Sequence, residues 1–295
     1  MRAKEMLDVS DSWLVFDVQG HFVGYVKGCF HPLPRLFVTV RRFSSIVRYG
    51  REPCLGGSEA ATVDPYTGYV KIVKPPSPRL LKDCNTRLCR AAYDLFILIS
   101  SAVDEEFIRV TGSLAVDPYK ASDIDLVVYG CSETYRAYKL LIDLRRDGIT
   151  RPYKGVGRGW NSKDIGLHQG LRTERVLLGL FKGIPYSLRL VDCIRAWRCT
   201  PFRVIGRCIK VRGRIERAMA YTTPSYYLVV LHEPLILGDN VVLKTLLIIT
   251  HRLKFMEIPE NTLIEVQGVL EEVDKSLYRL SPDHGGYISL VNRGS

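Results

Sequence analysis

One stretch, GSLAVDPYKASDIDLVVYG at residues 112–130, constrains the fold of this 295-residue chain more than any other. Gly112 and Ser113 follow the apolar run FIRV, and Asp123 and Asp125 open a second apolar run that ends at Tyr129. Side chains two residues apart on a strand project from the same face, so both carboxylates are expected on one side. Like charges this close repel unless a cation lies between them. The stretch therefore predicts two strands joined through Gly-Ser, with an acidic face that attracts cations.

Two carboxylates on one strand, with a third nearby, can hold two divalent cations about 4 Å apart. Cations of the magnesium type prefer oxygen ligands and substrate phosphates, which suits aspartate better than His or Cys. Gly112 permits a close backbone approach. Ser113 offers a hydroxyl and, if a helix starts there, backbone amides for a triphosphate. A strand cap with solvated acids is the alternative explanation of the same residues.

The pattern around this motif is that of an α/β unit. Apolar residues spaced three and four apart predict a helix that begins after a cap at Asp83 or Asn85. A second helix, capped by Ser132, is expected to run to about Arg146. A further helix is expected from about Thr173 to Phe181, followed by the strand YSLRLVDC. Residues 81–200 are therefore expected to form one α/β core.

The flanking segments are β-rich. Residues 12–42 predict short strands with a turn at Gln19-Gly20, and the Gly- and Pro-rich stretch up to residue 80 predicts a boundary. After residue 201, alternating apolar residues in five or so segments predict a small, OB-like β-barrel. The expected fold class is α+β, with a β-rich segment at 1–80, the core at 81–200 and the barrel at 201–295.

At the motif, the chain resembles the DNA polymerase beta-type nucleotidyltransferase superfamily, whose signature is an apolar strand, Gly-Ser, a spacer and Asp-x-Asp. Ser122 completes the form SDIDL that is common in that family, and we expect it among the residues that bind the nucleotide. The resemblance implies that Asp123 and Asp125 bind Mg²⁺ or Mn²⁺ and that Gly112 and Ser113 hold the phosphates of an NTP. The flanking segments are similar to parts of uncharacterised archaeal-type predicted nucleotidyltransferases.

The family also uses a third carboxylate on a later strand, often as the base for the acceptor hydroxyl. Asp192, in the apolar strand PYSLRLVDC, is the best match for a catalytic and metal-binding residue of this kind. Lys120 lies between the two halves of the motif, where it either contacts a phosphate or is a solvated loop lysine.

Positive charge is concentrated in the middle of the chain. The net charge is +11, and residues 145–217 hold 18 Lys or Arg against five Asp or Glu. This imbalance indicates either a polyanionic partner or a solvated basic surface. Lys210, Arg212 and Arg214 share one face of the first expected barrel strand and, with Tyr226 and Tyr227, form a candidate surface for RNA or DNA.

Three functions are consistent with these features. The first is transfer of a nucleoside monophosphate from an NTP to an acceptor hydroxyl, on nucleic acid or elsewhere. The second is nucleic-acid binding by a protein whose transferase core is weak or inactive. The third is modification of a protein or a small molecule.

No apolar run long enough to span a membrane and no secretory signal is found, so a cytoplasmic protein is expected. The eight cysteines show no zinc-ligand spacing, and whether Cys84 and Cys89 form a disulfide is left open.

Overall fold

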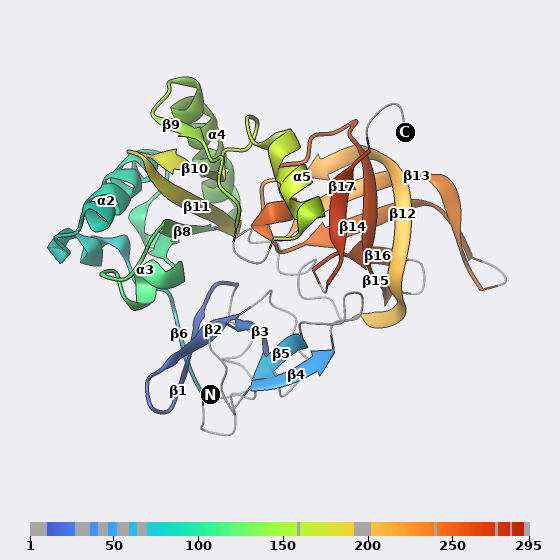
Figure 1. Cartoon of the computed structure of the whole chain (residues 1–295), viewed down its shortest axis with the longest axis horizontal. Coiled ribbons are helices and arrows are strands. Elements are labelled where there is room, and N and C mark those ends of the chain that lie inside the picture. Colours follow the sequence, from blue (N-terminus) through green and yellow to red (C-terminus); the bar gives the residue numbers. More distant parts are fainter. Residues whose placement is uncertain are drawn as a thin grey trace. The chain divides into compact units, whose positions relative to one another are not determined.

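The computed structural model describes residues 11–26, 36–40, 47–51, 59–63, 70–157, 160–191, 202–238, 241–274, 277–283 and 285–291 (Figure 1). The chain divides into two compact units. The first contains residues 1–50, 60–153 and 175–199, and the second contains residues 51–59, 154–174 and 200–295. Sheets dominate both units, and the described helices pack on them. The mixed α+β class and the richness in strands are confirmed.

The N-terminal strands form one six-stranded sheet in the order β4-β5-β3-β2-β1-β6. Its strands are β1 (Leu14–Asp17), β2 (Phe22–Val26), β3 (Leu36–Val40), β4 (Val47–Arg51), β5 (Glu59–Val63) and β6 (Val70–Val73). The predicted turn joins β1 to β2, and Gly20 has a φ of 81° there. The Asp17 carboxylate closes this turn by accepting hydrogen bonds from the backbone amides of Gln19 and His21.

The core sheet has five strands in the order β7-β8-β11-β10-β9. The strands are β7 (Ile108–Val110), β8 (Ile124–Tyr129), β9 (Thr150–Pro152), β10 (Leu178–Phe181) and β11 (Ile184–Val191). The central pair, β8 and β11, is parallel, and the register places Ser187 beside Asp125. Every side chain of β8 from Leu126 to Val128 is buried, so the centre of this sheet is the core of the unit.

Two long helices accompany this sheet, α2 (Arg87–Ser100) and α4 (Cys131–Arg146). The prediction that Ser132 caps α4 is wrong, because the cap position is Gly130 and the Ser132 hydroxyl donates to the Glu133 carboxylate inside the first turn. Short helical turns lie at η2 (Pro78–Asp83) and η3 (Glu105–Phe107). The cap of α2 is Thr86, one residue beyond the predicted Asn85, and its hydroxyl accepts from the Cys89 amide at 3.1 Å. Cys84 and Cys89 form a disulfide, which ties the end of η2 to the first turn of α2.

The prediction of a helix over residues 173–181 is wrong, because the second half of this segment forms strand β10. The two-residue turn Lys182-Gly183 joins β10 to β11, and both residues have positive φ, 50° and 77°. That geometry is typical of a tight β-hairpin and fixes an antiparallel pair. The helix of this region comes earlier, as α5 (Ser162–Leu171), where Asn161 and Asp164 form a reciprocal capping box.

The C-terminal strands form a closed sheet. They are β12 (Arg203–Met219), β13 (Ser225–Leu237), β14 (Val241–Thr250), β15 (Leu263–Asp274), β16 (Leu277–Ser281) and β17 (Tyr287–Leu290), with the turn η4 (Leu253–Phe255) after β14. The order is β12-β13-β14-β16-β15-β17, β14 and β16 are parallel, and an additional β12–β15 pairing closes the ring. The alternation predicted for β12 is confirmed, because Val211 and Ile215 are buried while Lys210 and Arg212 are exposed.

Helix α5 packs with this closed sheet in the second unit. Leu167 and Leu171 belong to the same apolar core as the barrel strands. Beside them, the Lys254 ammonium lies 2.7 Å from the buried Asp164 carboxylate. Burial lowers the pKa of Lys254, and the hydrogen bond to Asp164 opposes that shift. The pair links α5 to η4, so the helix is an integral part of the barrel unit.

Candidate functional site

The two aspartates of the motif lie where strand β8 begins. Ile124 between them is fully buried, whereas Asp123 and Asp125 are partly exposed, as expected for alternating faces. The hydroxyl of Ser122 donates to the Asp123 carboxylate at 3.2 Å. The hydroxyl of Ser187, on the parallel neighbour β11, donates to the Asp125 carboxylate at 2.5 Å. The prediction that both carboxylates share one face agrees with this geometry.

Gly112 provides the space for the Asp125 side chain. It starts the short helix α3 (Gly112–Val116) with a φ of 67°, a conformation that glycine adopts without strain. A Cβ atom at this position would lie 2.6 Å from the Asp125 Cβ and would overlap the carboxylate. The Thr111 amide also donates to the Asp125 carbonyl at 2.9 Å. The glycine and the second aspartate, separated by a spacer in sequence, therefore form one packed unit.

The other residues predicted to bind phosphate lie around this unit. Ser113 is exposed on the first turn of α3, and Ser122 is exposed beside Asp123. Lys120 extends into solvent, with 86% of its side chain exposed, and its ammonium lies 3.2 Å from the Asp117 carboxylate. The hydrogen bond from Lys120 lowers the pKa of Asp117. A phosphate contact by Lys120 would have to compete with this ion pair.

Asp192, predicted as the third carboxylate, lies outside the described residues. The residue level with Asp125 on β11 is Ser187, and no carboxylate occurs along β11 from Ile184 to Val191. Over the described ranges, no group of three or more His, Cys, Asp and Glu side chains has metal-binding geometry. The described part of the site is therefore two aspartates and one serine hydroxyl.

The sequence did not predict that Ser187 lies beside Asp125 or that Arg189 forms an ion pair with Asp11. Both residues lie on the same face of the sheet as Asp125, because the parallel register pairs Ser187 with Asp125 and Arg189 with Val127. The Arg189 guanidinium lies 3.7 Å from the carboxylate of Asp11. The alternation of β11 could have revealed this face, but only the register shows which residue stands beside Asp125.

The predicted basic strand face is partly engaged within the protein. The Glu265 carboxylate on β15 lies 3.1 Å from the Lys210 ammonium and 2.7 Å from Arg212 Nε. It also lies 3.3 Å from Lys163 on α5 and accepts a hydrogen bond from the Tyr287 hydroxyl at 2.6 Å. We call these five residues the Glu265 cluster. It contains three cations and one carboxylate, so it keeps an excess of positive charge.

The Glu265 cluster changes the acidity of its carboxyl group. Burial alone would raise the pKa of Glu265, but hydrogen bonds from Tyr287, Arg212, Lys210 and Lys163 outweigh burial and lower the pKa to about 2. Glu265 therefore stays ionised at all ordinary pH values. Arg214, the third predicted nucleic-acid residue, is exposed and forms no ion pair with any residue that the structure describes. The prediction that Tyr227 belongs to this surface is wrong, because Tyr227 is fully buried in the core and its hydroxyl donates to the Phe255 carbonyl at 2.8 Å.

Comparison with known proteins gives little guidance. No family model and no curated protein matches the chain. Nine chains of solved structures match, among them one described as "Crystal structure of p204 HINb domain". That match has 11% identity, covers 39% of this chain and 66% of the other, and has a TM-score of 0.22. At this TM-score the likeness carries no argument about this chain. Within the described ranges, no helix is both long and apolar enough to cross a membrane.

Proposed function

We propose that this protein is a metal-dependent nucleotidyltransferase that moves a nucleoside monophosphate from an NTP to an acceptor hydroxyl. The observation that carries this proposal is the packing of Asp125 against Gly112, with Asp123 two residues earlier, partly exposed as Asp125 is, on the other side of the buried Ile124. This arrangement gives a physical reason for the spacing of Gly-Ser and Asp-Ile-Asp. The proposal is further supported by the contact of α3, on which Ser113 is exposed, with β8, the strand that includes Asp125 and begins directly after Asp123.

The donor set fits a hard divalent cation. Two carboxylates with their oxygens on one face are ligands that Mg²⁺ and Mn²⁺ prefer, and such ions retain water and bind substrate phosphates. Divalent ions bound there would neutralise the charge that develops on the transferred phosphoryl group and on the leaving pyrophosphate.

The residues of the chain would hold and orient the substrate. Asp123 and Asp125 bind the metal-nucleotide complex, and Ser187 fixes the orientation of the Asp125 carboxylate through its hydrogen bond. The Ser113 hydroxyl and the first amides of α3 would donate to the triphosphate. Asp192 remains the predicted proton acceptor for the attacking hydroxyl, and the described strand β11 contains no Asp or Glu from Ile184 to Val191.

Binding of nucleotide tests the proposal more directly than activity, because an activity assay fails whenever the acceptor is wrong. Calorimetry should be performed with each of the four NTPs, in Mg²⁺ and in chelator. We expect binding that requires the metal and is lost in the Asp123→Asn/Asp125→Asn variant.

The matched control is Asp104→Asn/Glu106→Gln, which removes two acids that are exposed and form no ion pair with other described residues. This control should bind as the wild type does. Equal binding by wild type and Asp123→Asn/Asp125→Asn would overturn the assignment of the metal site.

A second function, nucleic-acid binding, is favoured by the closed C-terminal sheet. Its strand order β12-β13-β14-β16-β15, closed through β12 and β15, matches an OB-like barrel, a fold that often binds oligonucleotides. The Glu265 cluster and Arg214 give its surface the excess positive charge that phosphates require.

Arg214→Gln is the informative variant for this second function, since its side chain has no ion pair to lose among described residues. If the barrel binds nucleic acid, the affinity for a single strand and its dependence on salt should both fall. If neither changes, the barrel face around Arg214 does not contact the strand.

A further inference from the structure

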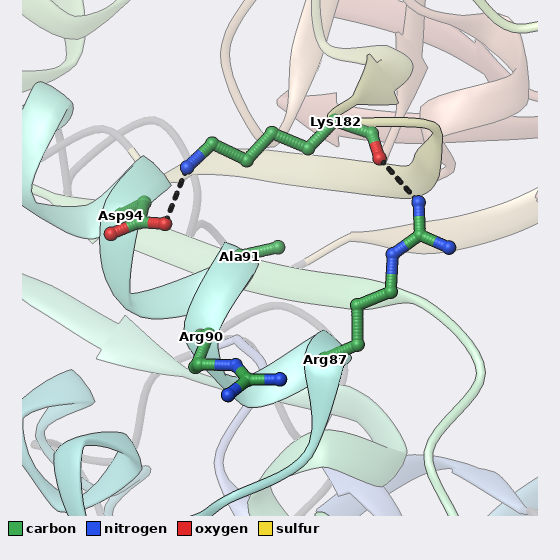
Figure 2. Close-up of a pocket in the computed structure, with 5 residues that line it drawn as sticks. All are labelled: Arg87, Arg90, Ala91, Asp94 and Lys182. Carbon is green, nitrogen blue, oxygen red and sulfur yellow. Dashed lines mark hydrogen bonds and ion pairs between the residues drawn. The ribbon is translucent and has the colours of Figure 1, made fainter.

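A basic hollow lies between helix α2 and the β10–β11 turn. It has a volume of about 330 Å³ and is lined by Arg87, Arg90, Ala91, Asp94 and Lys182. The four helical residues are spaced three and four apart, so they occupy one face of α2. Figure 2 shows the charged side chains grouped around Ala91, with Lys182 reaching across from the turn. The hollow is thus built by two elements that are distant in sequence.

The internal contacts of the hollow leave positive charge unused. Lys182 lies 2.6 Å from the Asp94 carboxylate, which neutralises one cation. The Arg87 guanidinium donates from one Nη to the Lys182 carbonyl at 3.0 Å, a contact with a neutral acceptor. The Arg90 guanidinium forms no hydrogen bond or ion pair with the described part of the chain. Two net positive charges and most of the guanidinium donors therefore face solvent.

Helix stability does not explain this arrangement. Arg87 and Arg90 are three residues apart and repel each other. They also lie in the first turns of α2, where the helix dipole disfavours cations, and that first turn has no acidic residue. A bound anion would relieve both unfavourable effects.

The hollow lies toward the end of the core sheet at which the parallel strands β8 and β11 begin. The Lys182-Gly183 turn immediately precedes β11, and the parallel register pairs Tyr186, the third residue of β11, with Ile124, the residue directly after Asp123. A nucleic-acid strand whose phosphates bound in the hollow would thus lie toward the same end of the sheet as the two aspartates.

We propose that the hollow formed by Arg87, Arg90 and Lys182 binds backbone phosphates of a single-stranded nucleic acid that serves as acceptor. Guanidinium groups suit phosphate oxygens through paired hydrogen bonds. The role of the bound strand as acceptor rests on the proposed function, but binding of the strand to the hollow needs neither nucleotide nor metal. The site therefore can be tested separately from Asp123 and Asp125.

The test is fluorescence anisotropy with labelled single-stranded RNA and DNA of about 16 nucleotides. The measurements should be made in chelator, without NTP, over a salt range from about 50 to about 200 mM. Arg90→Gln should weaken binding at least about fivefold and reduce the salt slope by about 0.7, the value for one phosphate contact to a single strand. Asp94→Asn removes the competing negative charge and should strengthen binding about threefold or more.

The matched control is Lys139→Gln, which removes one exposed positive charge from α4 of the same unit. The proposal is overturned if Arg90→Gln binds as Lys139→Gln does, or if the wild type binds no oligonucleotide. Calorimetry on Arg90→Gln with Mg²⁺ and NTP adds a further arm. Weakened NTP binding with unchanged oligonucleotide binding would assign the hollow to the nucleotide and also overturn the proposal. Failure of the proposed function would instead appear as absent NTP binding in the wild type.

Discussion

The Gly112→Ala variant isolates the packing on which the candidate site depends. An alanine there must adopt a φ of 67°, and its Cβ would lie 2.6 Å from the Asp125 Cβ, whereas real contacts rarely fall below 3.0 Å. The Asp125 Cβ is fixed to the strand backbone, so no rotamer change can remove this collision. The strand or the start of α3 must move, and the Ser187 hydrogen bond to Asp125 is expected to break with it.

Gly148→Ala provides the matched control, because Gly148 has a φ of 72° and an added Cβ would meet nothing within 4 Å. An alanine in the left-handed conformation destabilises the folded state by about 1–2 kcal/mol. Replacing glycine also lowers the entropy of the unfolded chain, which stabilises the folded state by about 0.4–1 kcal/mol. We therefore expect Gly148→Ala to lower the free energy of unfolding by about 1 kcal/mol. Gly112→Ala adds an overpacking cost of about 1–3 kcal/mol.

Two assays separate these effects. Urea unfolding gives the stability of both variants, and calorimetry with Mg²⁺ and NTP gives the state of the site. Gly112→Ala should lose more stability than Gly148→Ala and at least about tenfold in affinity, about 1.4 kcal/mol, while Gly148→Ala keeps the affinity of the wild type. Equal losses of stability would refute the packing argument, and unchanged affinity in Gly112→Ala would refute the link between this packing and the metal site.

Three further predictions concern other parts of the molecule. The pKa of Glu265 is lowered to about 2 from 4.5, so the contribution of its carboxylate to stability is complete above pH 4.5 and is lost as the pH falls toward 2. Glu265→Gln should therefore be less stable than wild type by about 2 kcal/mol at pH 7. In urea unfolding, the stability of Glu265→Gln should depend less on pH between 4.5 and 2 than that of the wild type. Ser187→Asp would place an acid beside Asp125, so thermal unfolding in chelator should shift to lower temperature, and Mg²⁺ should reverse the shift if the proposed metal site exists; a shift that Mg²⁺ leaves unchanged would count against the site. The Cys84–Cys89 disulfide closes a short loop, so Cys84→Ala/Cys89→Ala should lower the free energy of unfolding by about 2 kcal/mol, and a reductant should destabilise the wild type but not the variant.

Local signals in the sequence predicted the parts of the fold that depend on neighbouring residues. The β1–β2 hairpin followed from Gln19-Gly20, and α4 followed from its spaced apolar residues and the glycine after its end. The two-residue spacing of Asp123 and Asp125 agrees with the burial of Ile124 between two partly exposed side chains. The alternation in β12 predicted a strand with one basic side, which the burial of Val211 and exposure of Arg212 bear out.

The parts that failed depend on pairing between distant residues. Residues 173–181 carry apolar side chains whose spacing suits a helix, but the Lys182-Gly183 turn and pairing with β11 make β10 a strand. Lys210 and Arg212 carry the expected charges, yet Glu265, more than fifty residues later, holds both of them. Ser187 became part of the candidate site only through its register with β8. Spacing along one chain segment contains no information about such partners.

The path of the chain through α5 has a consequence for dissecting this protein. Residues 154–174 belong to the second unit, although they are flanked on both sides by strands of the core sheet. A fragment cut at residue 201 would lose Leu167 and Leu171 from the barrel interior, together with the Asp164 partner of the buried Lys254. Truncation at the boundary predicted from the alternating apolar residues would therefore yield an incomplete barrel prone to aggregate. An autonomous version requires α5 to be grafted back, for example by circular permutation through a linker to β12.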